Sequence, residues 1–285
     1  MKKAFSLVMA IAVCLLSLTS CSGPAKLKIN GTKIDNEVYE YFYDLTSENK
    51  EETKKAIIRY VTINSEFANR NLTLTPSQKS KLSEKVDDLW HIYGIYYQDL
   101  GISKQTIYKV ELSGVYEDVL LDYYYGQDGV EPVSEETLKK HFEKNYIAIS
   151  FATEYLFNID ENGATVPMTD AEKAVVINSF TRSVGLINTG SLVEEATDKD
   201  VYDTIINSSS DGSFPKGFYK SVAEIKEGSA EMVTLEDYVF LVKRIDVFDE
   251  TYNYYERYRT DCLRALKGKA FEKMVDQWSQ SYKAD

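Results

Sequence analysis

The fold is decided at residues 147–159, IAISFATEYLFNI, where large apolar residues fall on alternate positions. Ile149, Phe151, Tyr155 and Phe157 follow the two-residue period of a β-strand, whose successive side chains point to opposite faces. Before this stretch, the apolar residues have instead the spacing of amphipathic helices. The change of period predicts an α+β chain in which a β-containing segment begins near residue 147.

The chain before this strand is predicted to be mainly helical. Val38, Tyr41 and Phe42 recur at the i, i+3, i+4 spacing of one helix face. Thr75-Pro76-Ser77-Gln78 supplies the capping Thr, the early Pro and the Gln of a helix start. Lys26–Ile34 is predicted to be a short strand with a turn at Asn30-Gly31. The predicted helices cover residues 35–45, 50–71, 76–100, 103–125 and 134–146.

The chain after this strand is predicted to continue as an α+β segment. Helices are expected over residues 169–187, 191–206 and 218–226, and a strand over 233–247. This β-α-α-α-β order favours a compact domain. The tail, residues 249–283, returns to a helical pattern and is rich in aromatic residues.

The N-terminus has the pattern of an exported lipoprotein. Lys2 and Lys3 precede a mostly apolar stretch, residues 7–18, which is too short for a membrane-spanning helix. Leu18-Thr19-Ser20-Cys21 resembles the lipobox that bacterial lipoprotein signal peptidase recognises. We therefore expect a signal peptide over 1–20, a lipidated tether over 21–26 anchored by Cys21, and an extracytoplasmic location. The alternative is an ordinary signal peptide that ends near a chance cysteine.

Composition excludes several classes of function. With 33 basic and 45 acidic residues, the net charge is −12, which argues against a nucleic-acid partner. Cys14 lies in the signal peptide and Cys21 is predicted to be lipidated, so Cys262 has no partner for a disulfide. His91 and His141 are the chain's two histidines, so no metal site is expected. No phosphate-binding, dinucleotide-binding or hydrolase motif occurs, so no cofactor is expected either.

The order of these segments resembles the PrsA/SurA-type extracytoplasmic foldases. The matching stretches are Ile29-Asn-Gly-Thr-Lys-Ile34, Val133-Ser-Glu-Glu-Thr-Leu138 and Phe218-Tyr-Lys-Ser-Val-Ala-Glu-Ile-Lys-Glu-Gly228. The resemblance implies a helical chaperone module, in which an N-terminal segment packs with a C-terminal helix, and an inserted parvulin-like prolyl isomerase domain. It also implies unfolded or newly secreted polypeptides as partners. The corresponding boundaries are 27–146 and 248–285 for the chaperone module and 147–247 for the insert.

The catalytic positions of the parvulin pattern are changed in this chain. Parvulins carry a histidine in the first strand, where this sequence has Tyr155-Leu156-Phe157, and another in the last strand, where Val239 stands. Phe218 matches the apolar wall of the proline pocket. The resemblance therefore implies a degenerate pocket with no assigned catalytic residue, and a chaperone with little isomerase activity. An isomerase that works without histidines and a non-catalytic scaffold stay open as alternatives.

Tyrosine is heavily used, with 22 residues in the chain. Aromatic side chains with a polar tip suit a surface that holds unfolded polypeptides. The alternative is that they form the helix–helix core that joins the tail to the N-terminal segment. The client-binding candidates are Tyr93, Tyr96, Tyr97, Tyr124 and Tyr255.

Overall fold

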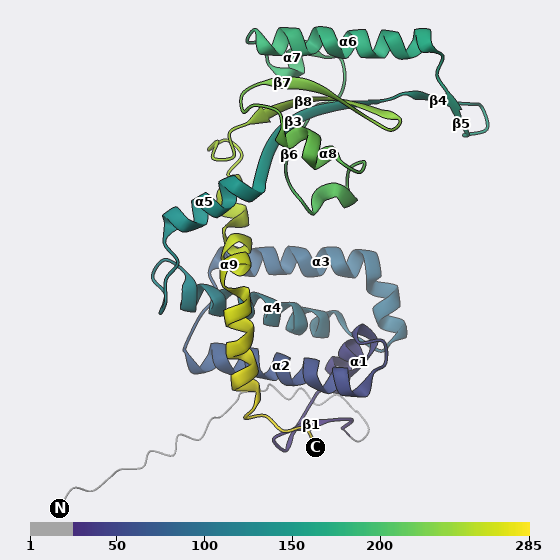
Figure 1. The fold of residues 1–285 in the computed structure, drawn as a ribbon. Coiled ribbons are helices and arrows are strands. Elements are labelled where there is room, and N and C mark those ends of the chain that lie inside the picture. Colours follow the sequence, from purple (N-terminus) through teal and green to yellow (C-terminus); the bar gives the residue numbers. More distant parts are fainter. Residues whose placement is uncertain (1–24) are drawn as a thin grey trace, which may run out of the picture. The chain divides into compact units, whose positions relative to one another are not determined.

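The computed structural model describes residues 25–285, and its fold is α+β, as the sequence predicts. The chain divides into two compact units (Figure 1). The helical unit contains the described residues up to Pro132 together with Leu263–Asp285, and the sheet unit contains Val133–Cys262. The predicted signal peptide and Cys21 lie outside the described residues. None of the helices within residues 25–285 is both long and apolar enough to cross a membrane.

The helical unit confirms the helices predicted from spacing and capping residues. Its elements are β1 (Lys28–Ile29), β2 (Thr32–Lys33), α1 (Asn36–Leu45), α2 (Lys50–Asn69), α3 (Pro76–Asp99), α4 (Lys104–Tyr125) and the second half of α9 (Tyr254–Ser279). Thr75 and Gln78 form the reciprocal capping box at the start of α3. Ser103 caps α4 by accepting a hydrogen bond from the Thr106 N–H. Helix α4 packs against both α2 and α3 (Figure 1).

The C-terminal half of α9 packs with the N-terminal helices. Phe271 and Val275 are each 1% exposed. Arg59 of α2 donates to both carboxylate oxygens of Glu272, with N–O distances of 2.6 and 2.8 Å. Glu117 of α4 forms an ion pair with Arg59 at 3.0 Å and another with Arg264 of α9 at 3.0 Å. Apolar burial and a shared ion-pair network therefore join the two ends of the chain in one unit.

Glu37 of α1 links that helix to the start of α4. Its carboxylate accepts hydrogen bonds from the Ser103 N–H at 2.9 Å and the Thr106 hydroxyl at 2.7 Å. Burial alone would raise the pKa of Glu37, but these hydrogen bonds and Lys109 outweigh it, so the pKa is lowered from its ordinary value of 4.5. The negative charge also lies at the N-terminal end of α4, where it is favoured by the helix dipole.

Glu37→Gln should reduce the free energy of unfolding by about 1 kcal/mol at pH 7, because the charged acceptor is lost. A lowered pKa in the folded state stabilises the protein above the ordinary value of 4.5, and this stabilisation is lost as the pH falls through the lowered pKa. The difference between wild type and variant should therefore shrink below pH 4.5. Urea unfolding between pH 7 and pH 3 measures it. Glu143→Gln, at an exposed position of the sheet unit, is the control, and an equal effect there would contradict this role of Glu37.

The sheet unit is built on one antiparallel sheet with strand order β6-β3-β8-β7. Its strands are β3 (Tyr146–Tyr155), β6 (Tyr202–Asn207), β7 (Ala230–Leu235) and β8 (Tyr238–Ile245). The short strands β4 (Phe157–Ile159) and β5 (Thr165–Pro167) form a separate hairpin. The helical elements are α5 (Glu135–Asn145), α6 (Asp170–Asn188), α7 (Val193–Ala196), the 3-10 turn η1 (Ser210–Gly212), α8 (Phe218–Ala223) and the first half of α9.

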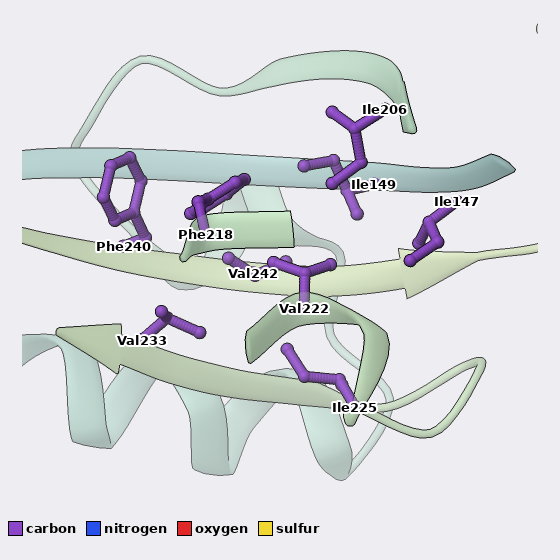
Figure 2. Close-up of a cluster of buried hydrophobic side chains, with 9 residues drawn as sticks. All are labelled: Ile147, Ile149, Ile206, Phe218, Val222, Ile225, Val233, Phe240 and Val242. Atoms are coloured by element: carbon purple, nitrogen blue, oxygen red, sulfur yellow. The ribbon is translucent and has the colours of Figure 1, made fainter. Parts of the chain in front are cut away.

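The two faces of this sheet carry separate apolar cores. On one face, Phe218 and Val222 of α8 pack against Ile149, Phe240 and Val242 of the central strands (Figure 2). On the other face, Phe180 and Ile187 of α6 pack against Ala152, Val239 and Leu241. Neighbouring strand residues belong to different cores because successive side chains point to opposite sides of a sheet.

Two element predictions in this unit are wrong in part. Residues 191–206 were predicted to be one helix, but the helix is limited to α7, and β6 follows. The alternating, β-branched stretch of β6 pairs with β3, whose partner residues lie far away in sequence, and this pairing overrides the local helical signal. Residues 233–247 were predicted as one strand. Strand β8 confirms this prediction for Tyr238–Ile245, but residues 233–235 are the end of a separate strand, β7, joined to β8 by a turn. The turn between them contains Glu236, which has a left-handed φ of 52°. Such turns are usually recognised in a sequence by Gly, Asn or Asp, so a Glu at this position did not indicate one.

Candidate functional site

The four positions matched to the parvulin pocket do not share one surface. Phe218 is 1% exposed in the core under α8, whereas Val239 is fully buried in the core under α6. Phe240, one residue further along β8, is the residue that faces Phe218, with ring centroids 4.7 Å apart. Because the side-chain period of a strand is two, Phe240 shares a face of the sheet with Phe218, whereas Val239 lies on the opposite face.

Aromatic rings fill the space beside α8. Phe214 stacks on Phe218 at 4.3 Å with an interplanar angle of 6°, and Phe151 lies edge-on to Phe214 at 5.5 Å. Phe240 completes this cluster of four phenylalanines, which contributes no acid, base or hydrogen-bonding side chain. Figure 2 shows two of its members, Phe218 and Phe240. Sequence reasoning missed Phe214 and Phe240, although strict two-residue counting along β8 would have found Phe240. This cluster offers apolar contact and no proton-transfer chemistry.

Tyr155 ends β3, and Phe157 begins the neighbouring strand β4. Tyr155, the last residue of β3, is 46% exposed. Its ring lies 4.7 Å from that of Phe157 and 5.3 Å from that of Tyr238. Tyr238 in turn stacks on Phe240, with ring centroids 6.0 Å apart. Tyr155, Phe157 and Tyr238 therefore connect the buried aromatic cluster to the protein surface.

The helical unit exposes large apolar side chains on the second half of α3. Ile92, Tyr93, Ile95 and Tyr96 are 66%, 50%, 80% and 49% exposed. At i, i+1, i+3 and i+4, they form two adjacent rows on one side of the helix. We call these four residues the α3 ridge. Leu82 and Val86, earlier on the same helix, are buried in the core that α3 shares with α4. Val86 lies seven residues, or two turns, before Tyr93 and therefore on the same side of the helix as Tyr93.

The α3 ridge is supported by ordered neighbours. The Tyr96 hydroxyl donates to the Asp44 carboxylate at 2.6 Å, and this hydrogen bond raises the pKa of Tyr96. Beneath it, half-buried Tyr97 lies 6.5 Å from the ring of Trp90 and 6.3 Å from that of Tyr41. Burial raises the pKa of Tyr97. Tyr93 and Tyr96 also lie 6.4 and 5.8 Å from the ring of Tyr97, so these two tyrosines are held by packed neighbours and lose little freedom when they bind a partner.

The structure separates the five tyrosine candidates. Tyr93 and Tyr96 are exposed, and Tyr97 is half-buried. Tyr124 is half-buried and accepts a hydrogen bond from Arg70 Nε at 3.0 Å, which gives it a structural role. Tyr255 is 6% exposed and packs 5.4 Å from Phe142, so it offers no binding surface. Sequence reasoning missed Ile92 and Ile95, although both fall outside the helix face defined by Leu82 and Val86.

The helical unit also has a shallow cavity, but its charged side chains are paired with each other. A shallow cavity of about 320 Å³ lies between α3 and α4, lined by Ser83, Val86, Asp87, Lys104, Gln105 and Tyr108. Asp87 and Lys104 form an ion pair there at 2.6 Å, so neither charge is available unpaired to a ligand. Within residues 25–285, no group of three or more His, Cys, Asp or Glu side chains could hold a metal ion.

Comparisons with known proteins give matches among solved structures. No protein-family model and no curated protein sequence match the chain. Foldase protein PrsA from Streptococcus pneumoniae is similar at 14% identity and a TM-score of 0.44, covering 88% of this chain and 91% of that chain. Foldase PrsA from Lactococcus lactis has 12% identity, a TM-score of 0.39 and coverages of 91% and 93%. PrsA from Bacillus subtilis has 13% identity and a TM-score of 0.38, and the match covers 83% of this chain and 86% of that chain. The first two structures are named foldases, and all three carry the name PrsA.

Proposed function

We propose that this chain is a membrane-anchored extracytoplasmic chaperone that binds apolar segments of newly secreted polypeptides and has little isomerase activity. The observation that carries the proposal is the α3 ridge, where four adjacent large side chains are 49–80% exposed. Soluble proteins seldom leave contiguous apolar surface open unless it binds something. The sequence resemblance to PrsA/SurA-type foldases supports a non-native polypeptide as the partner.

The ridge has the chemistry of a weak and unselective binding surface. Isoleucine offers apolar area without hydrogen-bonding demands, and tyrosine adds stiff area with a polar tip. Fully burying such a side chain gains about 1.5–3 kcal/mol, and the ordering of a flexible client offsets much of that gain. Binding should therefore be reversible. The net charge of −12 favours solubility of the loaded complex.

The low isomerase activity is proposed from the aromatic cluster beside α8. A prolyl ring needs an open apolar pocket, and here the rings of Phe214, Phe218 and Phe240 occupy the space. Neither β3 nor β8 carries a histidine. Uncatalysed prolyl isomerisation takes tens of seconds, so even modest catalysis would be visible in refolding kinetics.

The location is proposed from the N-terminal sequence. The lipobox-like Leu18–Cys21 would place the lipid on Cys21 after removal of residues 1–20. More than one acyl chain is needed for a stable anchor. The proposed chaperone module comprises residues 27–146 and 248–285, and the proposed parvulin-like domain comprises 147–247.

Replacing Ile92 and Ile95 together by serine should remove at least about half of the chaperone effect, because two of the most exposed apolar contacts are lost. The measurement is refolding of a proline-limited, aggregation-prone test protein with residues 25–285, recording soluble yield and the rate of the slow phase. Wild type should raise the yield and leave the rate unchanged.

Val175→Ser is the matched control, because Val175 is a single apolar residue of α6 that is 70% exposed. It should behave as wild type. Equal yields with the double variant and wild type would exclude the α3 ridge as the client surface. A faster slow phase at substoichiometric wild-type protein would favour the isomerase alternative, and no effect on either quantity would favour a scaffold.

A further inference from the structure

Strand β6 lies at one edge of the sheet, so half of its backbone N–H and C=O groups point toward β3 and the other half point away from the sheet. In an antiparallel ladder, alternate residues direct both backbone groups toward the same neighbour. The Asn207 N–H donates to Ser210 Oγ at 3.0 Å, so Asn207 points away from β3. By the same alternation, Ile205 and Asp203 direct their N–H and C=O groups outward.

The pairing of β3 leads independently to the same assignment. The Leu156 N–H donates to the Asp237 carbonyl at 2.7 Å, so even-numbered residues of β3 face the β8 side. Odd-numbered residues therefore face β6, where Ile149 and Phe151 are opposite Thr204 and Tyr202. Thr204 and Tyr202 use their backbone groups within the sheet, which leaves those of Asp203 and Ile205 outside.

The two edges of the sheet are not equally protected. At the β7 edge, the Asn188 side chain accepts from the Ala230 N–H at 2.8 Å and donates to its carbonyl at 2.9 Å. At the β6 edge, no hydrogen bond from elsewhere in residues 25–285 reaches the outward backbone groups of Asp203 or Ile205. The strand sequence, YDTIIN, also lacks the Pro and Lys residues that commonly protect edges.

The side chains around β6 indicate which segment would fit. Tyr202 is 52% exposed and lies 5.7 Å from the ring of half-buried Phe151, which gives an apolar contact on one face. Asp198 and Asp200 precede the strand and are exposed, and Asp203 lies within it, where its carboxylate hydrogen-bonds to the Tyr252 hydroxyl. Nearby Lys199 is already paired with Glu154. The β6 edge therefore carries negative charge beside an aromatic surface. A bound segment would match it best with basic and apolar side chains at alternating positions.

We propose that the outer edge of β6 binds an extended basic–apolar segment of a non-native polypeptide as an added strand. The segment bonds to the outward groups of Asp203 and Ile205, places apolar side chains beside Tyr202, and pairs its basic side chains with the acidic residues. Backbone pairing supplies affinity and alternate side chains supply selectivity, as in other strand additions. This inference rests on the proposed function for the source of the segment.

The test uses residues 25–285 and a capped octapeptide of alternating Lys and Val. Amide hydrogen exchange followed by NMR should show the Asp203 and Ile205 amides slowed at least about tenfold by the peptide, with Thr204 and Ile206 unchanged. Ile205→Pro should weaken peptide binding at least about tenfold, because it deletes the outward N–H without removing a β3 hydrogen bond. Thr234→Pro is the matched control at an outward position of β7 and should bind within about twofold of wild type.

A second variant keeps the test decisive if Ile205→Pro alters folding. Asp200→Lys changes an exposed charge and should weaken the peptide about threefold at low salt. The inference is overturned if the Asp203 and Ile205 amides are not slowed, or if folded Ile205→Pro binds normally. Peptide effects confined to the α3 ridge would overturn it and leave the proposed function standing. Protection at β6 by the peptide, in a wild-type protein that does not raise the refolding yield, would support it while the proposed function fails.

Discussion

Replacing Phe271 by alanine is expected to destabilise the helical unit by about 3–5 kcal/mol, a large part of the stability of a domain. Phe271 is 1% exposed, and its ring lies edge-on to Trp278 at 6.1 Å. The substitution removes a whole ring from the packing that joins α9 to the N-terminal helices. Urea unfolding followed by tryptophan fluorescence reports this unit, because Trp90 and Trp278 both belong to it.

Leu266→Ala is the matched control on the same helix. Leu266 is 39% exposed, so its loss should cost less than about 1 kcal/mol. If both variants lowered stability equally, the C-terminal half of α9 would not be docked through Phe271. A large effect for Phe271 alone would show that the two ends of the chain fold as one unit.

The helical unit could be predicted well because its signals are local. The reciprocal Thr75–Gln78 cap and the Ser103 cap each depend on only a few adjacent residues, and both form in the structure. Strand β6 could not be predicted in this way. Its conformation depends on pairing with β3, a contact between residues about 55 positions apart in sequence, and the neighbouring α7 supplied a competing helical signal.

The candidate surfaces were harder to predict than the elements that carry them. Helix α3 has apolar residues on more than one side, and spacing alone did not show that Tyr93 is 50% exposed while Val86, two turns earlier on the same side, is buried. Tyr96 and Tyr97 are adjacent, yet only Tyr97 turns toward Trp90. Burial of a helix face depends on where the neighbouring helices lie, which no local pattern contains.

Replacing Val239 by histidine is expected to destabilise the sheet unit by about 3 kcal/mol or more without creating isomerase activity. The sequence match places a parvulin histidine here, but Val239 is fully buried among the apolar residues under α6. A larger polar ring at that position meets close packing and finds no partner for its N–H, and both effects oppose folding. Thermal unfolding followed by circular dichroism measures the loss, and proline-limited refolding measures the activity.

Val166→His is the matched control, since Val166 is a strand residue of the same unit that is 43% exposed. It should change stability by no more than about 0.5 kcal/mol. A stable Val239→His variant that accelerates the slow refolding phase would contradict the assignment, because it would place the isomerase surface under α6. An unstable and inactive variant would instead agree with the structure, in which the Phe240 side chain faces α8 and the Val239 side chain faces α6.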